Sequence, residues 1–117
     1  MVLNFSNSTE LLKNAHENQL YPKLVAQLLK DFGLANIQID IALGLRPVEL
    51  KNILHEKVYV LLMERFSEYL NLLYIVDVPE KAFKEIHGTN VVEVAEQVSF
   101  LILKREMQKV LLKSKYS

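Results

Sequence analysis

Three histidines are the side chains in this sequence best suited to proton transfer or metal binding near neutral pH. His16, His55 and His87 are spread along the chain, and none has a second histidine three or four positions away. A helical metal site needs ligands one turn apart, as in the His-Glu-x-x-His pattern, so these histidines predict no metal centre. We interpret them as surface or helix-end residues.

Two glutamates one helical turn apart are the next candidates for chemistry. Glu64 and Glu68 could hold a cation, or repel each other so that one pKa rises. A helical di-metal centre also needs a Glu-x-x-His pattern on a second helix, and the sequence contains none. Arg65 lies between the two glutamates and favours surface ion pairs instead. A small helical enzyme or metal-binding protein that uses this pair and a histidine is therefore a remote alternative.

Other catalytic patterns are missing from the sequence. It contains no cysteine, so it offers no thiolate nucleophile, and no serine lies in a Gly-x-Ser-x-Gly pattern. The three glycines, Gly33, Gly44 and Gly88, are too scattered for a phosphate-binding loop. We predict that each ends a helix or forms a turn in which positive φ is needed. These observations predict a protein that is not an enzyme and uses no cofactor.

The charge balance argues against nucleic acid as a partner. Fourteen basic residues balance fourteen acidic ones, so the chain has no net field that attracts a polyanion. Residues 20–50 nevertheless have the outline of a helix-turn-helix, and a DNA-binding regulator is the main alternative function. Its recognition helix would be 36–43, which has no lysine or arginine and would turn Asp40 toward phosphates.

Basic residues recur near the end of the last predicted helix. The candidate basic patch consists of Lys104, Arg105, Lys109 and Lys113, of which the last three are four residues apart. Positive charges near a helix C-terminus gain about 0.3–1 kcal/mol each from the helix dipole, which is enough to explain their placement. An acidic protein partner or nucleic acid is the alternative explanation.

Helix-start signals show which elements position these residues. A capping residue followed three positions later by glutamate occurs at Asn7, Asp77 and Asn90, and Arg46-Pro47 is a related start. We predict a first helix from Ser8, a second one that starts near Pro22 and ends at Gly33, and a short helix over 79–86.

The segment 35–43 can be interpreted in two ways. Its isoleucines, Ile37, Ile39 and Ile41, alternate with polar residues as in a strand, whereas Asn36 and Gly44 bracket it like a helix. We interpret it as a short helix. The alternative is a minor two-stranded sheet that pairs 35–43 with 72–78.

Together these signals predict an all-α protein whose residues 1–117 form a single domain. It is a helical bundle of about five or six helices, with two long antiparallel helices over about 47–76 and 90–113. The polar residues of the first and second halves of 47–76 lie well over a quarter-turn apart, and 58–63 is apolar throughout. We therefore expect this helix to be surrounded by neighbours or by a second subunit.

The apolar content predicts self-association. Half of the residues are hydrophobic, which is at the top of the usual range for soluble proteins, so a second copy is expected to cover part of the surface. Several aromatic residues, including Tyr74, lie on the 47–76 helix, and Met107 and its neighbours face away from the main stripe of the last helix. The candidate interface residues are Val58, Tyr59, Leu62, Phe66, Tyr69, Leu73, Met107, Val110 and Leu111.

The expected function is protein interaction or scaffolding by a non-enzymatic module that forms a homodimer and has room for another protein partner. We expect no membrane span, because charged residues interrupt the apolar stretch 58–76. The absence of cysteine, and of a secretory pattern in residues 1–8, favours a cytoplasmic protein.

Overall fold

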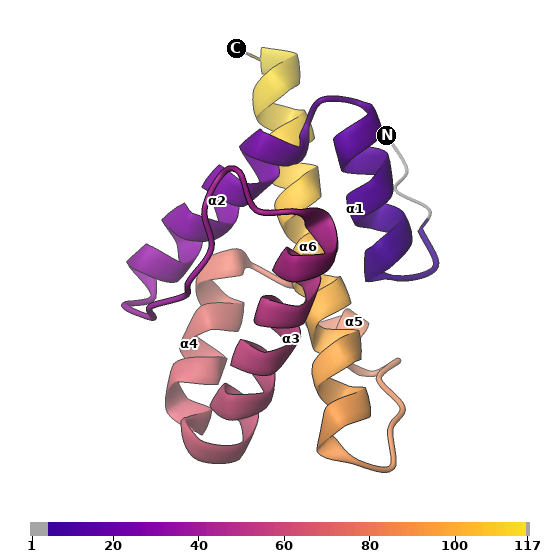
Figure 1. The fold of residues 1–117 in the computed structure, drawn as a ribbon. Coiled ribbons are helices and arrows are strands. Elements are labelled where there is room, and N and C mark those ends of the chain that lie inside the picture. The colour runs from indigo at the N-terminus through magenta and orange to yellow at the C-terminus, as the bar shows by residue number, and fades with distance from the viewer. Residues whose placement is uncertain (1–4, 117) are drawn as a thin grey trace.

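The computed structural model describes residues 5–116, which form six helices and no strand (Figure 1). This confirms the all-α class and rules out the two-stranded sheet. No helix in this range combines the length and hydropathy that crossing a bilayer requires. The helices are α1 (Ser8–Glu17), α2 (Tyr21–Leu34), α3 (Pro47–Glu64), α4 (Phe66–Val76), α5 (Glu80–Phe83) and α6 (Val91–Tyr116).

Most of the predicted helix starts are confirmed. The Asn7 Oδ1 accepts a hydrogen bond from the Glu10 amide at 2.9 Å, and Asn90 caps α6 in the same way. Pro47 is the first residue of α3, and Pro22 lies in the first turn of α2, so α1 and α2 are separate helices. A proline is tolerated there because the first turn of a helix leaves its amides unpaired.

Asp77 was wrongly predicted as a helix start. It ends α4 with φ 69°, and its amide donates to the Leu73 carbonyl oxygen at 2.9 Å. Aspartate and asparagine tolerate this left-handed conformation better than most residues. In residues 5–116 the positive φ angles belong to Gln19, Asn36 and Asp77 and to no glycine, so the positive φ predicted for the glycines is also wrong.

The predicted 47–76 helix is broken at Arg65. Arg65 has φ −140° and ψ 58°, and α3 and α4 form a hairpin around it (Figure 1). The two halves of this segment present their polar residues in different directions, so one straight helix could not turn both apolar faces toward one core. The break allows Leu61 of α3 and Leu72 of α4 to be buried together.

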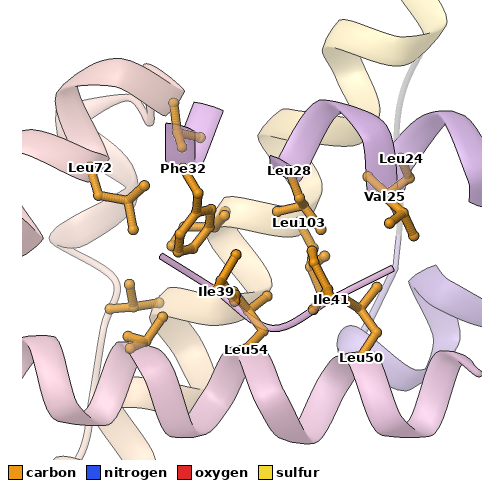
Figure 2. Close-up of a cluster of buried hydrophobic side chains, with 14 of the residues drawn as sticks. Leu24, Val25, Leu28, Phe32, Ile39, Ile41, Leu50, Leu54, Leu72 and Leu103 are labelled. Carbon is orange, nitrogen blue, oxygen red and sulfur yellow. The ribbon is translucent and has the colours of Figure 1, made fainter. Parts of the chain in front are cut away.

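The segment 35–43 is an extended connection, so the predicted short helix is wrong. After a turn at Ala35 and Asn36, the chain crosses between α2 and α3 with alternate residues buried. Figure 2 shows Ile39 and Ile41 in one apolar cluster with Leu50 and Leu54 of α3. Its isoleucines therefore alternate as in a strand, because the segment lies across the core with one side facing solvent.

The core is built around α6. Helices α3 and α6 run antiparallel and pack closely, and α2 covers the C-terminal half of α6 (Figure 1). Ile102, Leu103 and Met107 of α6 are almost fully buried. The far end of α6 therefore meets α2 of the same chain, which explains why Met107 and its neighbours face away from the main stripe of this helix.

Candidate functional site

The structure divides the nine candidate interface residues into core and surface. Only Tyr59 and Phe66 are exposed, while Leu62 and Leu111 are partly buried. The other five face the chain's own core and have no free surface to offer a partner. These five are Val58, Tyr69, Leu73, Met107 and Val110.

A row of exposed apolar side chains runs along α4, and we call it the α4 ridge. It consists of Phe66, Leu70 and Tyr74, which are 54%, 52% and 81% exposed. Their spacing of four residues places them in one row along the helix surface. Sequence reasoning named Phe66 and noted Tyr74 but missed Leu70, although the spacing of four was readable once α4 was treated as a separate helix.

The charged residues beside the ridge, Arg65 and Glu68, pair with each other. The Arg65 Nη1 lies 3.1 Å from a Glu68 carboxylate oxygen, so these charges neutralise each other. The ring of Phe66 rests near that of Tyr69, with centroids 5.3 Å apart, which anchors one end of the ridge to a buried side chain. The ridge can therefore form apolar contacts with a partner.

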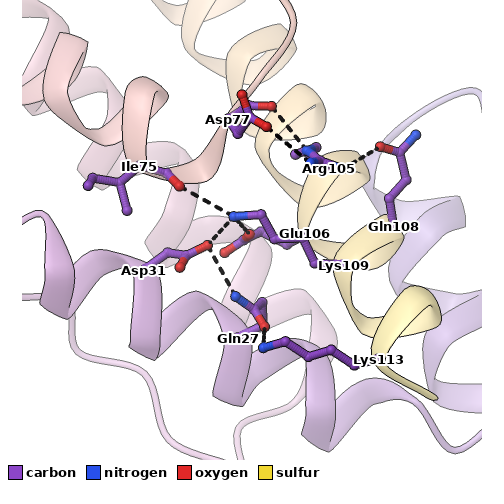
Figure 3. Close-up of polar contacts among 9 residues, drawn as sticks. All are labelled: Gln27, Asp31, Ile75, Asp77, Arg105, Glu106, Gln108, Lys109 and Lys113. Carbon is purple, nitrogen blue, oxygen red and sulfur yellow. Dashed lines mark hydrogen bonds and ion pairs between the residues drawn. The ribbon is translucent and has the colours of Figure 1, made fainter. Parts of the chain in front are cut away.

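The candidate basic patch is largely an internal set of contacts, which we call the α6 ladder (Figure 3). Arg105 donates to the backbone and carboxylate oxygens of Asp77 at 3.0 and 3.2 Å. One turn later the Lys109 Nζ lies 2.7 Å from Asp31 of α2. A further turn on, the Lys113 Nζ donates to Gln27 at 2.6 Å. Three of the four basic residues thus tie α6 to other parts of the chain, and Lys104 is only partly exposed.

Glu106 is a fully buried acidic residue of α6 that lies beside this ladder. Neither of its carboxyl oxygens accepts a hydrogen bond within residues 5–116, and Oε1 is 3.4 Å from the Lys109 Nζ. Burial raises the pKa of Glu106 to about 9, and a hydrogen bond to Asp31 and the negative charge of Asp31 act in the same direction. Glu106 is therefore a neutral acid at pH 7.

Asp31 is also buried, but its pKa shifts in the opposite direction to the pKa of Glu106. Desolvation by itself would raise its pKa, but hydrogen bonds with Glu106, Lys109 and Gln27 outweigh this, and the pKa of Asp31 is lowered. Asp31 is thus the ionised partner of Lys109 and accepts a hydrogen bond from the protonated Glu106 carboxyl. Sequence reasoning missed both acids. The signal was available for Glu106, which continues the apolar series Val98, Ile102 in steps of four.

His55 differs from the surface histidine that we predicted. Its ring is half-buried, and Nε2 is buried without a hydrogen-bond partner in the described chain. Burial lowers the pKa of His55 even though the charge of Glu96 acts to raise it. A cavity of about 440 Å³ beside it is lined by side chains from three helices, including Ser8 of α1 and Lys51 of α3.

The remaining candidates for catalysis, metal binding or DNA binding do not form a site. The break at Arg65 puts Glu64 and Glu68 on different helices, and Glu68 pairs with Arg65. Within residues 5–116 no three His, Asp or Glu side chains lie close enough to hold a metal ion. The DNA-binding alternative lacks its recognition helix, since 36–43 is extended and its isoleucines are buried.

No protein-family model, curated protein or solved structure matches this chain.

Proposed function

We propose that this protein is a non-enzymatic helical interaction module that forms a homodimer through the α4 ridge. The observation that carries the proposal is the exposure of Phe66, Leu70 and Tyr74 on one face of α4. Contiguous apolar surface of this kind is typical of protein interfaces, particularly where aromatic residues contribute to it.

The order of side chains along the ridge supports a second copy as the partner. Leu70 lies midway between two aromatic residues, four positions from each. If two α4 helices pack antiparallel across a two-fold axis, Leu70 meets Leu70 of the other copy, and Phe66 of each copy lies beside Tyr74 of the other. The same patch is then used on both subunits, as a two-fold interface requires. Rows at a spacing of four also interdigitate in the commonest class of helix packing.

Two exposed apolar residues of α3 are not part of the ridge, and Tyr59 lines a groove with Val92 and Ala95 of α6. Met63 is exposed at the end of α3, and Tyr59 is exposed one turn before it. Of the eleven large hydrophobic side chains that are exposed in the described chain, three lie in the ridge. Their regular spacing of four distinguishes the ridge from the scattered exposed leucines of other helices.

The size of the ridge predicts a weak and reversible dimer. Helix α4 has 11 residues, so it is about 16 Å long at 1.5 Å per residue. A single helix pair of that length buries less than the roughly 1,200–2,000 Å² of a stable interface. We therefore expect a Kd on the order of micromolar or weaker.

Sedimentation equilibrium over roughly 5–500 µM protein tests the proposal, because this range brackets a micromolar Kd. The wild type should shift from monomer toward dimer, and Leu70→Glu should stay monomeric because it puts two carboxylates at the two-fold axis. Leu112→Glu is the matched control, since Leu112 is a 51% exposed leucine on α6 and outside the ridge. A wild type that stays monomeric throughout, or equal loss of dimer in both variants, would refute the proposal.

A further inference from the structure

A groove between α2 and the C-terminal half of α6 carries positive charge and no negative charge. It has a volume of about 370 Å³, and its lining includes Lys23 and Lys30 of α2 and Lys113 of α6. No aspartate or glutamate belongs to the lining. Because the whole chain has no net charge, this is a local concentration of positive charge.

The lysines of the groove are able to bind another molecule. Lys23 and Lys30 are exposed and form no ion pair or hydrogen bond within residues 5–116. Lys113 donates one hydrogen bond to Gln27, which leaves two of the three ammonium donors. Asp31 does not neutralise them, because it is buried and bonded to Lys109 and Gln27.

The spacing of the charges and the composition of the groove indicate a helical segment as occupant. Lys23 and Lys30 are seven residues apart, which is two helical turns or about 10 Å along α2. Carboxylates seven residues apart on a second helix would match them. Between the lysines, the exposed Ala26 supplies an apolar side chain that suits a small aliphatic residue better than a phosphate backbone.

We propose that the α2–α6 groove binds an acidic amphipathic helix of a protein partner, with Lys23 and Lys30 holding two of its carboxylates and an aliphatic side chain resting on Ala26. This goes beyond the proposed homodimer and does not depend on it, because the groove and the α4 ridge share no residue. Nucleic acid is a different class of partner, and the experiment below separates the two.

Fluorescence anisotropy with a labelled helical peptide tests the proposal. The peptide carries glutamates seven residues apart with leucine between them, and a second peptide with lysine in place of glutamate is the negative probe. The acidic peptide should bind, and addition of salt should weaken it. Lys23→Glu with Lys30→Glu should weaken binding by at least about tenfold, since two attractions become repulsions.

The matched control is Lys81→Glu with Lys84→Glu, which makes the same change of net charge at exposed lysines near α5. It should leave the affinity within about twofold, because those charges lie beyond the short screening length in salt. Circular dichroism verifies that both double variants are folded. Equal weakening by the two pairs, tighter binding of single-stranded polyuridine at the same lysines, or no binding of the acidic peptide would each overturn the proposal.

Discussion

Replacement of Glu106 by glutamine should make this protein more stable at neutral and alkaline pH. The buried carboxyl has a pKa of about 9 in the folded chain, compared with an ordinary value of 4.5. Between these values the folded protein keeps a proton that the unfolded chain releases. The stability contributed by Glu106 is thus fully present below pH 4.5 and is lost as the pH rises toward 9. Glutamine has the same shape, donates to Asp31 as the neutral acid does, and has no proton to release.

The expected size of the effect follows from the difference in pKa. Stability falls by about 1.4 kcal/mol per pH unit where one proton is released on unfolding. Between pH 5 and pH 8 the wild type should therefore lose on the order of 4 kcal/mol relative to Glu106→Gln. Asp31 does not counteract this change. Its lowered pKa gives stability that is present above its ordinary value of 3.8 and is lost only as the pH falls below that value.

Urea unfolding of both proteins at pH 5, 6, 7 and 8 measures the effect directly. The two free energies of unfolding should be similar at pH 5 and should diverge steadily as the pH rises. Glu85→Gln, an exposed glutamate in the turn after α5, is the control and should track the wild type. Parallel curves for the wild type and Glu106→Gln would refute the reasoning, because they would mean that folding does not change the protonation of Glu106.

Two further stability predictions follow from individual residues. Asp31→Ala removes the carboxylate that lies 2.7 Å from the mostly buried Lys109 and should cost about 3 kcal/mol at pH 7 by urea unfolding. A loss below about 1 kcal/mol would show that Glu106 ionises and replaces it. Gly33→Ala should stabilise the protein by about 0.5–1 kcal/mol, because Gly33 lies in α2 without positive φ and a Cβ there would have no atom within 4 Å. A lower melting temperature for this variant would contradict the helical assignment at Gly33.

The helix starts could be predicted because their causes are local. Asn7 and Asn90 satisfy amides only three residues away, and Pro47 needs only the first turn of its own helix. The sequence also carried the signal for the α4 ridge in the spacing of Phe66, Leu70 and Tyr74. That signal was missed because 47–76 was treated as one helix. In a single helix the α4 residues continue the helical rotation of α3 and do not stand out as a separate row.

Features that depend on distant neighbours were predicted less well. No glycine or proline marks the break at Arg65, which exists because both halves of the hairpin must face one core. The isoleucines of 37–41 fit a strand or a buried connection equally well by themselves. Only the packing of α2 and α3 on either side of the segment decides between these two structures. The basic stripe of α6 had a sufficient local explanation in the helix dipole, so the pairing of its side chains with α2 was not expected.

The sequence by itself determined the all-α class, most of the helix starts and the apolar character of the chain, because each of these follows from interactions within a few residues. The tertiary structure alone decided which polar side chains are buried together. Lys109 meets Asp31 across 78 positions of sequence, and Glu106 stays neutral because the packing of α2 against α6 excludes water from its carboxyl and places Asp31 beside it. Desolvation and charge pairing of this kind depend on three-dimensional neighbours, which local periodicity does not encode.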